Sequence, residues 1–144
     1  MAKTTDIYSV KKVNNLEFKF DNSTSVSTPT TVWTAGADDG ILRSFGLTST
    51  NSSDILVQVF RNIPSPGLGA DILLGTIKVV ANSGNDGVTP AVDVFRSVLL
   101  PYLSIDAQGN PVLFSSGTTI IKAMPLTAPG SGHYIYGVGD GGDY

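Results

Sequence analysis

The stretch "TTVWTAGADDGILRSFGLTST" (Thr30–Thr50) decides the fold class of this 144-residue chain. It opens on β-branched and aromatic residues, among them Trp33, the only tryptophan. The turn "GADDG" follows and ends in Asp-Gly, a strong signal for a hairpin between two strands. "ILRSFGLTST" then returns to strand-forming residues. We therefore predict two strands around a tight turn, with the Trp33 side chain in the core.

The alternation of short strand-forming runs with polar turns continues along the chain. The run "DILVQVFRNI" places Ile55, Val57 and Val59 on one face and Leu56 and Phe60 on the other. Apolar residues on both faces are typical of a strand near an interface and also of a central strand. Roughly eight such runs, separated by Gly, Pro, Asn and Asp, favour an all-β, antiparallel sandwich or barrel.

One segment, "TPAVDVFRSVLLPYL", has the apolar spacing of a helix instead of a strand. Thr89 suits the N-cap position, and Pro90 suits the first helical position, where its missing N–H has no partner to lose. Pro101 ends the pattern because it cannot continue a helix. We predict one short helix over about residues 90–100.

The first part of the chain reads as an arm. In "NLEFKFD" the side chains of Leu16, Phe18 and Phe20 alternate with charged ones, as in a half-buried strand. The Ser- and Thr-rich run "NSTSVSTPTT" follows as a connector. We predict an N-terminal arm and linker over residues 1–29 and a β-sandwich domain over residues 30–144. The arm strand either pairs within its own domain or adds to a neighbouring subunit's sheet, and the second alternative makes its three apolar residues candidates for a protein interface.

The chain closes on "GHYIYGVGDGGDY", which contains the only histidine. Its alternation puts Tyr134 and Tyr136 on one face and His133 on the other. We therefore predict that the stretch is a strand and not a cluster of metal or catalytic ligands. We expect the glycine-rich end to be an exposed tail. Asp140 and Asp143 lie in that tail without the following Glu that a calcium loop requires. The two tyrosines are further candidates for an exposed contact surface.

The residue inventory leaves little room for catalysis. Without cysteine and with a single histidine, thiolate chemistry and multi-histidine zinc sites are excluded. No nucleophile elbow or phosphate-binding glycine loop occurs. Asp38 and Asp39 read as turn residues, although a hydrolase that uses aspartates remains an alternative if two carboxylates share a cleft. We predict no catalytic, metal or cofactor site.

Charge and hydropathy narrow the class of partner. The net charge is −3 and only 15% of residues are charged, so we expect no nucleic-acid partner. No apolar run is long enough for a membrane helix, and the N-terminus lacks the apolar core of a signal peptide. We expect a protein that neither enters a membrane nor is exported. The charged fraction lies below the usual ~25%, which indicates that partners cover part of the surface.

Four segments have the order and pattern seen in a known family. These segments are "TTVWTAGADDGILRSFGLTST", "LLGTIKVV", "TPAVDVFRSVLLPYLSIDAQGNPVLFSSGTTIIKAM" and the closing "GDGGDY". The most distinctive part is "LLPYLSIDAQGNPVLF" followed by "GTTIIKA". In these segments the chain resembles small structural proteins of tailed-bacteriophage virions, of the type classed as capsid decoration (cement) proteins. The resemblance covers about Thr30 to Tyr144 and leaves out residues 1–29.

The resemblance implies a β-sandwich, often jelly-roll-like, that sits on the capsid surface of the virion and locks its subunits. It implies no enzyme activity and no cofactor. The expected partners are the major capsid protein and copies of the chain itself, as a homo-oligomer such as a trimer, with assembly in the host bacterial cytoplasm. The alternative is a carbohydrate- or receptor-binding module of a phage tail or head fibre, which would use Tyr134 and Tyr136.

Overall fold

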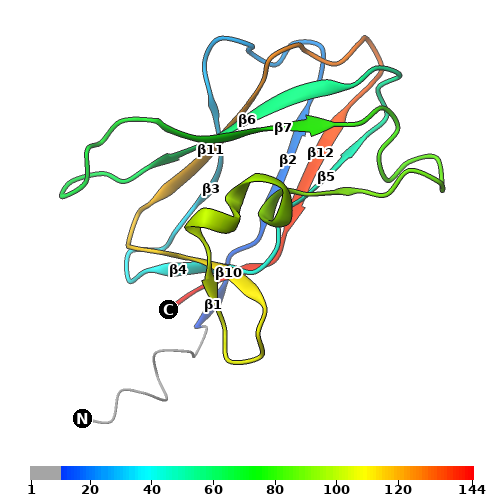
Figure 1. The fold of residues 1–144 in the computed structure, drawn as a ribbon. Coiled ribbons are helices and arrows are strands. Elements are labelled where there is room, and N and C mark those ends of the chain that lie inside the picture. The colour runs from blue at the N-terminus through cyan, green and yellow to red at the C-terminus, as the bar shows by residue number, and fades with distance from the viewer. Residues whose placement is uncertain (1–10) are drawn as a thin grey trace, which may run out of the picture.

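The computed structural model describes residues 11–144, so residues 1–10 of the predicted arm lie outside the described residues. Strands make up 43% of the chain and helical turns 7%, which confirms the all-β fold (Figure 1). The strands form three antiparallel sheets, consistent with a β-sandwich. The jelly-roll arrangement stays a prediction.

The three sheets follow from the strand pairing. The five-stranded sheet has the order β1 (Lys12–Val13), β13 (Gly141–Asp143), β4 (Gly40–Leu42), β10 (Pro111–Ser115) and β9 (Ser104–Ile105). One four-stranded sheet has the order β3 (Thr30–Thr34), β11 (Ile120–Pro125), β6 (Ile55–Asn62) and β7 (Ile72–Val79). The other has the order β2 (Leu16–Phe20), β12 (Ile135–Gly139), β5 (Gly46–Ser49) and β8 (Val92–Asp93).

A single hydrophobic core fills the space between these sheets. In Figure 1, β6 and β7 run across the view in front of β2 and β12, which run up it. The alternating apolar faces of these strands meet in the core, whose large members include Trp33, Phe45, Leu47, Val57, Val59, Phe95, Ile121 and Ile135. The indole N–H of Trp33 donates to the carbonyl oxygen of Asn14 at 2.9 Å, which satisfies the one polar atom of this side chain.

The predicted hairpin at Gly36–Gly40 is wrong in its pairing, although the turn itself is present. Asp39 adopts a positive φ of 81°, which Asp tolerates better than most residues. The strand before the turn pairs with β11, whereas the strand after it pairs with β10 and β13. The turn therefore carries the chain from one sheet to another. A local turn signal specifies that the chain reverses, and the non-local partners decide which strands bond.

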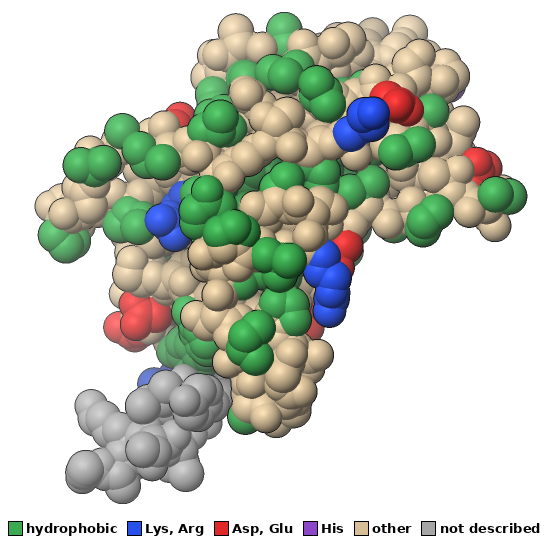
Figure 2. Space-filling model, in the orientation of Figure 1, with side chains coloured by type: hydrophobic (Ala, Val, Ile, Leu, Met, Phe, Trp, Pro, Cys, Tyr) green, Lys and Arg blue, Asp and Glu red, His purple; other side chains and the backbone are tan. Residues whose placement is uncertain are grey.

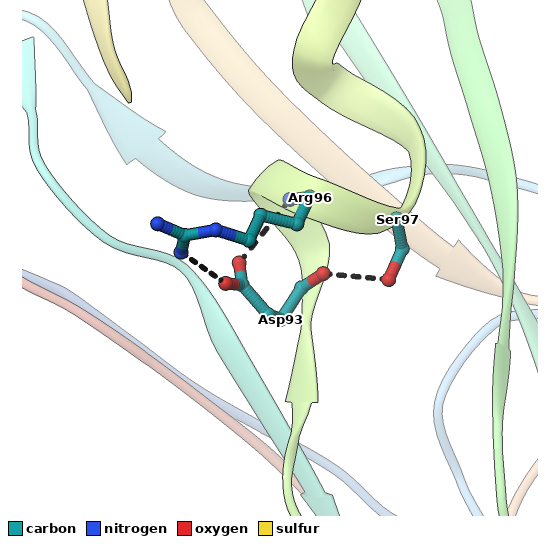
Figure 3. A network of polar contacts seen from close by, with 3 residues as sticks. All are labelled: Asp93, Arg96 and Ser97. Atoms are coloured by element: carbon teal, nitrogen blue, oxygen red, sulfur yellow. Dashed lines mark hydrogen bonds and ion pairs between the residues drawn. The ribbon is translucent and has the colours of Figure 1, made fainter. Parts of the chain in front are cut away.

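The predicted helix is shorter and begins later than expected. It consists of a π-helical turn, η1 (Phe95–Leu99), and a 3₁₀ turn, η2 (Leu100–Tyr102). Thr89 does not cap it; instead Asp93 stands at its start and accepts from the backbone N–H of Arg96 at 3.3 Å. The Asp93 carboxylate also pairs with the Arg96 guanidinium at 2.8 Å, and the Asp93 carbonyl accepts from the Ser97 hydroxyl at 2.6 Å (Figure 3).

Residues 12–20 run antiparallel to residues 135–143 in one register. The register is Lys12 with Asp143 in the first sheet and Leu16 with Gly139 in the third, so it continues unshifted across the break between the sheets. Asn14 lies at this break between the two sheets. Its side-chain amide stabilises the pairing of the chain ends by donating a hydrogen bond to the Asp143 carboxylate at 2.8 Å. The strand that we assigned to an arm thus belongs to the sandwich itself, and the boundary at residues 29 and 30 is wrong for it. Its pairing within the chain resolves the alternative that the sequence left open.

The glycine-rich end is an ordered strand, not the exposed tail that we expected. Gly141 and Gly142 are buried, and β13 lies between β1 and β4. The carboxylate of Asp143 accepts a hydrogen bond from the backbone N–H of Gly36 at 3.0 Å. This bond links the end of the chain to the Gly36–Gly40 turn. The glycines permit close strand approach: a Cβ on Gly137 would overlap the ring of Phe18.

Within residues 11–144, neither helical turn is long and apolar enough to cross a membrane.

Candidate protein-interaction surfaces

The three candidate residues on β2 do not form a shared exposed surface. Leu16 and Phe20 are 0% and 1% exposed and belong to the chain's own core, so we withdraw them as interface residues. Phe18 is half-buried and packs on Phe20 and Phe45, with ring centroids 4.8 and 6.0 Å apart. The physical reason is the pairing of β2 with β12, which turns all three side chains toward the interior.

The two candidate tyrosines come together on the outer face of β12. The ring centroids of Tyr134 and Tyr136 are 5.7 Å apart, and the Tyr136 side chain is exposed. The Lys19 ammonium lies 4.8 Å from the centroid of the Tyr134 ring, a cation–π contact supplied by the neighbouring strand β2. Val138 continues the row as a 60% exposed apolar side chain. This tyrosine face is therefore open to solvent and bordered by a cation.

A second surface lies on the outer side of the β11–β6–β7 sheet. The inward residues of β6 are buried, whereas its outward residues Leu56 and Phe60 are apolar as well. Leu56 is 44% exposed, and Leu73 on β7 lies opposite Phe60 and is 48% exposed. Leu126 follows β11 beside Leu56, to whose carbonyl oxygen its N–H donates at 2.8 Å. We call these four residues the outer apolar face.

Sequence reasoning found part of this face but not its exposure. The pattern "DILVQVFRNI" showed apolar residues on both sides of the strand, which fitted both a central strand and one at an interface. The structure makes β6 a central strand, between β11 and β7, and leaves its outer side in solvent. Polar side chains share this side of the sheet: Lys78 lies opposite Leu56, Thr76 opposite Gln58, and Lys122 opposite Phe60. The outer apolar face is therefore a mixed surface in which exposed leucines stand beside two lysines.

A small polar cluster borders the outer apolar face. Asp71 lies 3.0 Å from the Lys122 ammonium and accepts from the Asn62 side chain at 2.9 Å. The hydrogen bond from Asn62, helped by Lys122, holds the pKa of the Asp71 carboxyl below its usual range. Asp71 is therefore ionised at neutral pH and fixes the start of β7 against its neighbours.

The aspartates Asp38 and Asp39 line an open hollow of about 440 Å³ beside Phe114 and Tyr144. A second hollow of about 620 Å³ shares Phe114 and Tyr144 with it and adds Ile105 and Arg43. In the part of the chain that the structure describes, no group of three or more His, Cys, Asp or Glu residues is placed to hold a metal ion. Asp38 and Asp39 are adjacent in a turn, as predicted.

We compared the chain with protein-family models, with curated proteins and with solved structures, and none of the three comparisons found a match.

Proposed function

We propose that the protein is a non-enzymatic structural protein of a phage virion that binds the outside of the capsid lattice and stabilises it. The resemblance of its segments between Thr30 and Tyr144 to decoration proteins motivates this function. The observation that carries it in the structure is the outer apolar face. Its partner is the major capsid protein, and the complex assembles in the host bacterial cytoplasm and remains on the virion surface.

The chemistry of the outer apolar face suits a protein partner. Three of its side chains, Leu56, Leu73 and Leu126, are each between 41% and 48% exposed and can bury more area only against another surface. Removing apolar area from water yields about 25 cal/mol per Å², so burial of these three leucines contributes to affinity. On a repeating lattice, several modest contacts made by one oligomer add up as avidity.

Co-sedimentation of the purified protein with undecorated capsids of its own phage tests the proposal. We expect saturable binding at a fixed number of copies per particle, with weak salt dependence because the contact is apolar. The variant Leu56→Asp should weaken binding at least tenfold, since it places a charge in the contact. Val88→Asp is the matched control, because Val88 is 87% exposed and lies on the loop between β7 and β8, outside the outer apolar face.

One outcome would contradict the function, and another would contradict only the part that the outer apolar face plays in it. Absence of binding to capsids would remove the decoration function altogether. Equal binding by Leu56→Asp and the wild type would remove the outer apolar face from the contact while leaving the function itself in place.

A second candidate, a carbohydrate- or receptor-binding module, is favoured by the tyrosine face. The exposed ring of Tyr136 beside the half-buried ring of Tyr134 can stack on the apolar side of a sugar, and the adjacent Lys19 adds a hydrogen-bond donor. Glycan binding measured on an array, lost in Tyr136→Ala and retained in Leu56→Asp, would support this function. Binding to no glycan would exclude the carbohydrate form of it.

A further inference from the structure

The loop between β6 and β7 projects from the body as a finger with an apolar surface. We use the name β6–β7 finger for residues 61–72, which extend to the left of the body in Figure 1. Figure 2 shows hydrophobic side chains gathered on this projection. Leu68 is 84% exposed at the end of the loop, and Ile63, Ile72 and Arg61 line a hollow beneath it.

The finger is held in one shape by its own contacts. The N–H of Gly67 donates to the carbonyl oxygen of Pro64 at 2.7 Å, and the N–H of Gly69 donates to that of Ile63 at 2.9 Å. At its base, Asp71 accepts a hydrogen bond from Asn62 on the neighbouring strand β6 and pairs with Lys122 on β11, the strand beyond it. A projection that is already ordered loses little entropy when it binds, which favours its use as a contact element.

A groove of matching character lies on the five-stranded sheet. The two hollows that share Phe114 and Tyr144 adjoin each other, and we call them together the β4–β10 groove. Ile105, which is 64% exposed, and Phe114, which is 39% exposed, give it an apolar wall. The two open hollows measure about 440 and 620 Å³.

The charges on the finger and on the groove are complementary. Arg61 lines the finger hollow. Its guanidinium group has no hydrogen-bond or ion-pair partner within residues 11–144. Asp38 and Asp39 are exposed at one end of the groove, and their carboxylates are likewise unpaired within that range. Because Asp71 is already bonded to Lys122, Arg61 is the charge that the finger presents to a partner.

We propose that the β6–β7 finger of one molecule inserts into the β4–β10 groove of a second copy of this chain. The finger leaves the body at one side in Figure 1, while β4 and β10 lie at the bottom, so one molecule uses two different surfaces. Leu68 lies against Ile105 and Phe114 of the next copy, and Arg61 pairs with Asp38. Such a head-to-tail contact repeats from copy to copy and closes into a ring when the rotation permits. This assembly goes beyond the proposed capsid binding and needs no capsid.

Sedimentation velocity of the purified protein without capsids tests the inference. We expect the wild type and the control Val88→Asp to sediment as the same oligomer. Leu68→Asp in the finger and Ile105→Asp in the groove should each sediment as a monomer, because either change buries a charge in the contact. Both sites are exposed, and unchanged circular dichroism verifies that each variant folds.

Mixing the two monomeric variants tests whether the finger and the groove bind each other. Leu68→Asp keeps an intact groove and Ile105→Asp keeps an intact finger, so the mixture should form a one-to-one dimer and nothing larger. A mixture that stays monomeric would overturn the pairing of finger with groove. A wild type that stops at a dimer would overturn the head-to-tail arrangement, because that contact continues to a ring or a longer chain.

Charge reversal tests the electrostatic part. Arg61→Glu should weaken association about tenfold or more, and adding Asp38→Arg in the same chain should restore it. The inference is overturned if the wild type stays monomeric up to about 1 mM. It is equally overturned if the oligomer persists in Leu68→Asp and Ile105→Asp. Capsid binding by a monomeric wild type would keep the proposed function while removing this contact.

Discussion

Ser115 carries a polar atom that the fold does not use. The residue is 6% exposed, and its hydroxyl oxygen is buried without a hydrogen-bond partner within the described chain. An unpaired buried hydroxyl costs about 1–3 kcal/mol relative to a satisfied one. Nothing in the sequence marks this position, because a serine next to a turn reads as solvent-exposed.

The substitution Ser115→Ala should raise the free energy of unfolding by about 1 kcal/mol, since it removes the unpaired hydroxyl with little change in shape. Urea unfolding with an unchanged m-value measures the effect. Thr119→Val is the matched comparison, because the Thr119 hydroxyl is buried and lies 3.1 Å from that of Ser116. That variant should lose about 1 kcal/mol. A loss of stability in Ser115→Ala would show that its hydroxyl has a partner.

Asp71 links stability to pH. Its folded-state pKa lies below the unfolded value because Asn62 and Lys122 favour the carboxylate. The contribution is therefore fully present above the unfolded pKa of about 3.9 and is lost as pH falls through the lower, folded value. Asp71→Asn should cost at most about 1 kcal/mol at pH 7, because the pair is partly exposed and screened by solvent.

Urea unfolding of Asp71→Asn and wild type at a series of pH values checks this effect. The difference in stability should stay constant from pH 7 to about pH 5 and shrink below about pH 4. A difference that does not change with pH would contradict a charge-based contribution and point to packing of the side chain instead.

At the scale of elements, the N-terminal strand was the least well predicted. The alternation of Leu16, Phe18 and Phe20 correctly indicated a strand with an apolar face. The polar connector after it suggested that this strand lies apart from the body. A polar connector does not determine which strand pairs with the segment before it. The unshifted register from β1–β13 to β2–β12 shows that the strand is fixed along its length.

Deletion of residues 1–29 should therefore abolish folding. The deletion removes β1 and β2, exposes the backbone of β12 and β13, and takes Leu16 and Phe20 out of the core, each worth about 1.5–3 kcal/mol. Circular dichroism and proton NMR dispersion of the deleted chain measure the result. Deletion of residues 1–10 is the control, because it leaves every described strand in place. Native-like dispersion in residues 30–144 alone would restore the arm as a separate unit.

At the scale of the whole molecule, the two ends of the chain complete two of the three sheets. β12 lies between β2 and β5, and β13 lies between β1 and β4, so neither sheet is continuous without the C-terminal strands. The first turn adds a further tie through the bond from Gly36 to Asp143. Contacts between distant parts of the sequence thus hold the structure together, and a single domain of this size usually unfolds all-or-none.

We expect one thermal unfolding transition with equal calorimetric and van't Hoff enthalpies. For a chain of this size the enthalpy should be about 100 kcal/mol near 60 °C. Scanning calorimetry on Leu68→Asp, the variant expected to be monomeric, avoids the contribution of association. Two separated transitions would mean that one sheet unfolds without the others and would contradict the role of the paired chain ends.

The sequence by itself determined the all-β class, the burial of Trp33 and of the inward residues Ile55, Val57 and Val59, and the turns at glycine and aspartate. These properties depend on alternation and on local backbone preference, which act over a few residues. Only the tertiary structure decided the partners of β3 and β4, the place of β2 in the sandwich and the ordered end of the chain. It alone also placed the finger and the groove on different sides of the molecule. Hydrogen bonding between strands is satisfied equally well by many partners, so the choice among them follows from packing of side chains far apart in sequence.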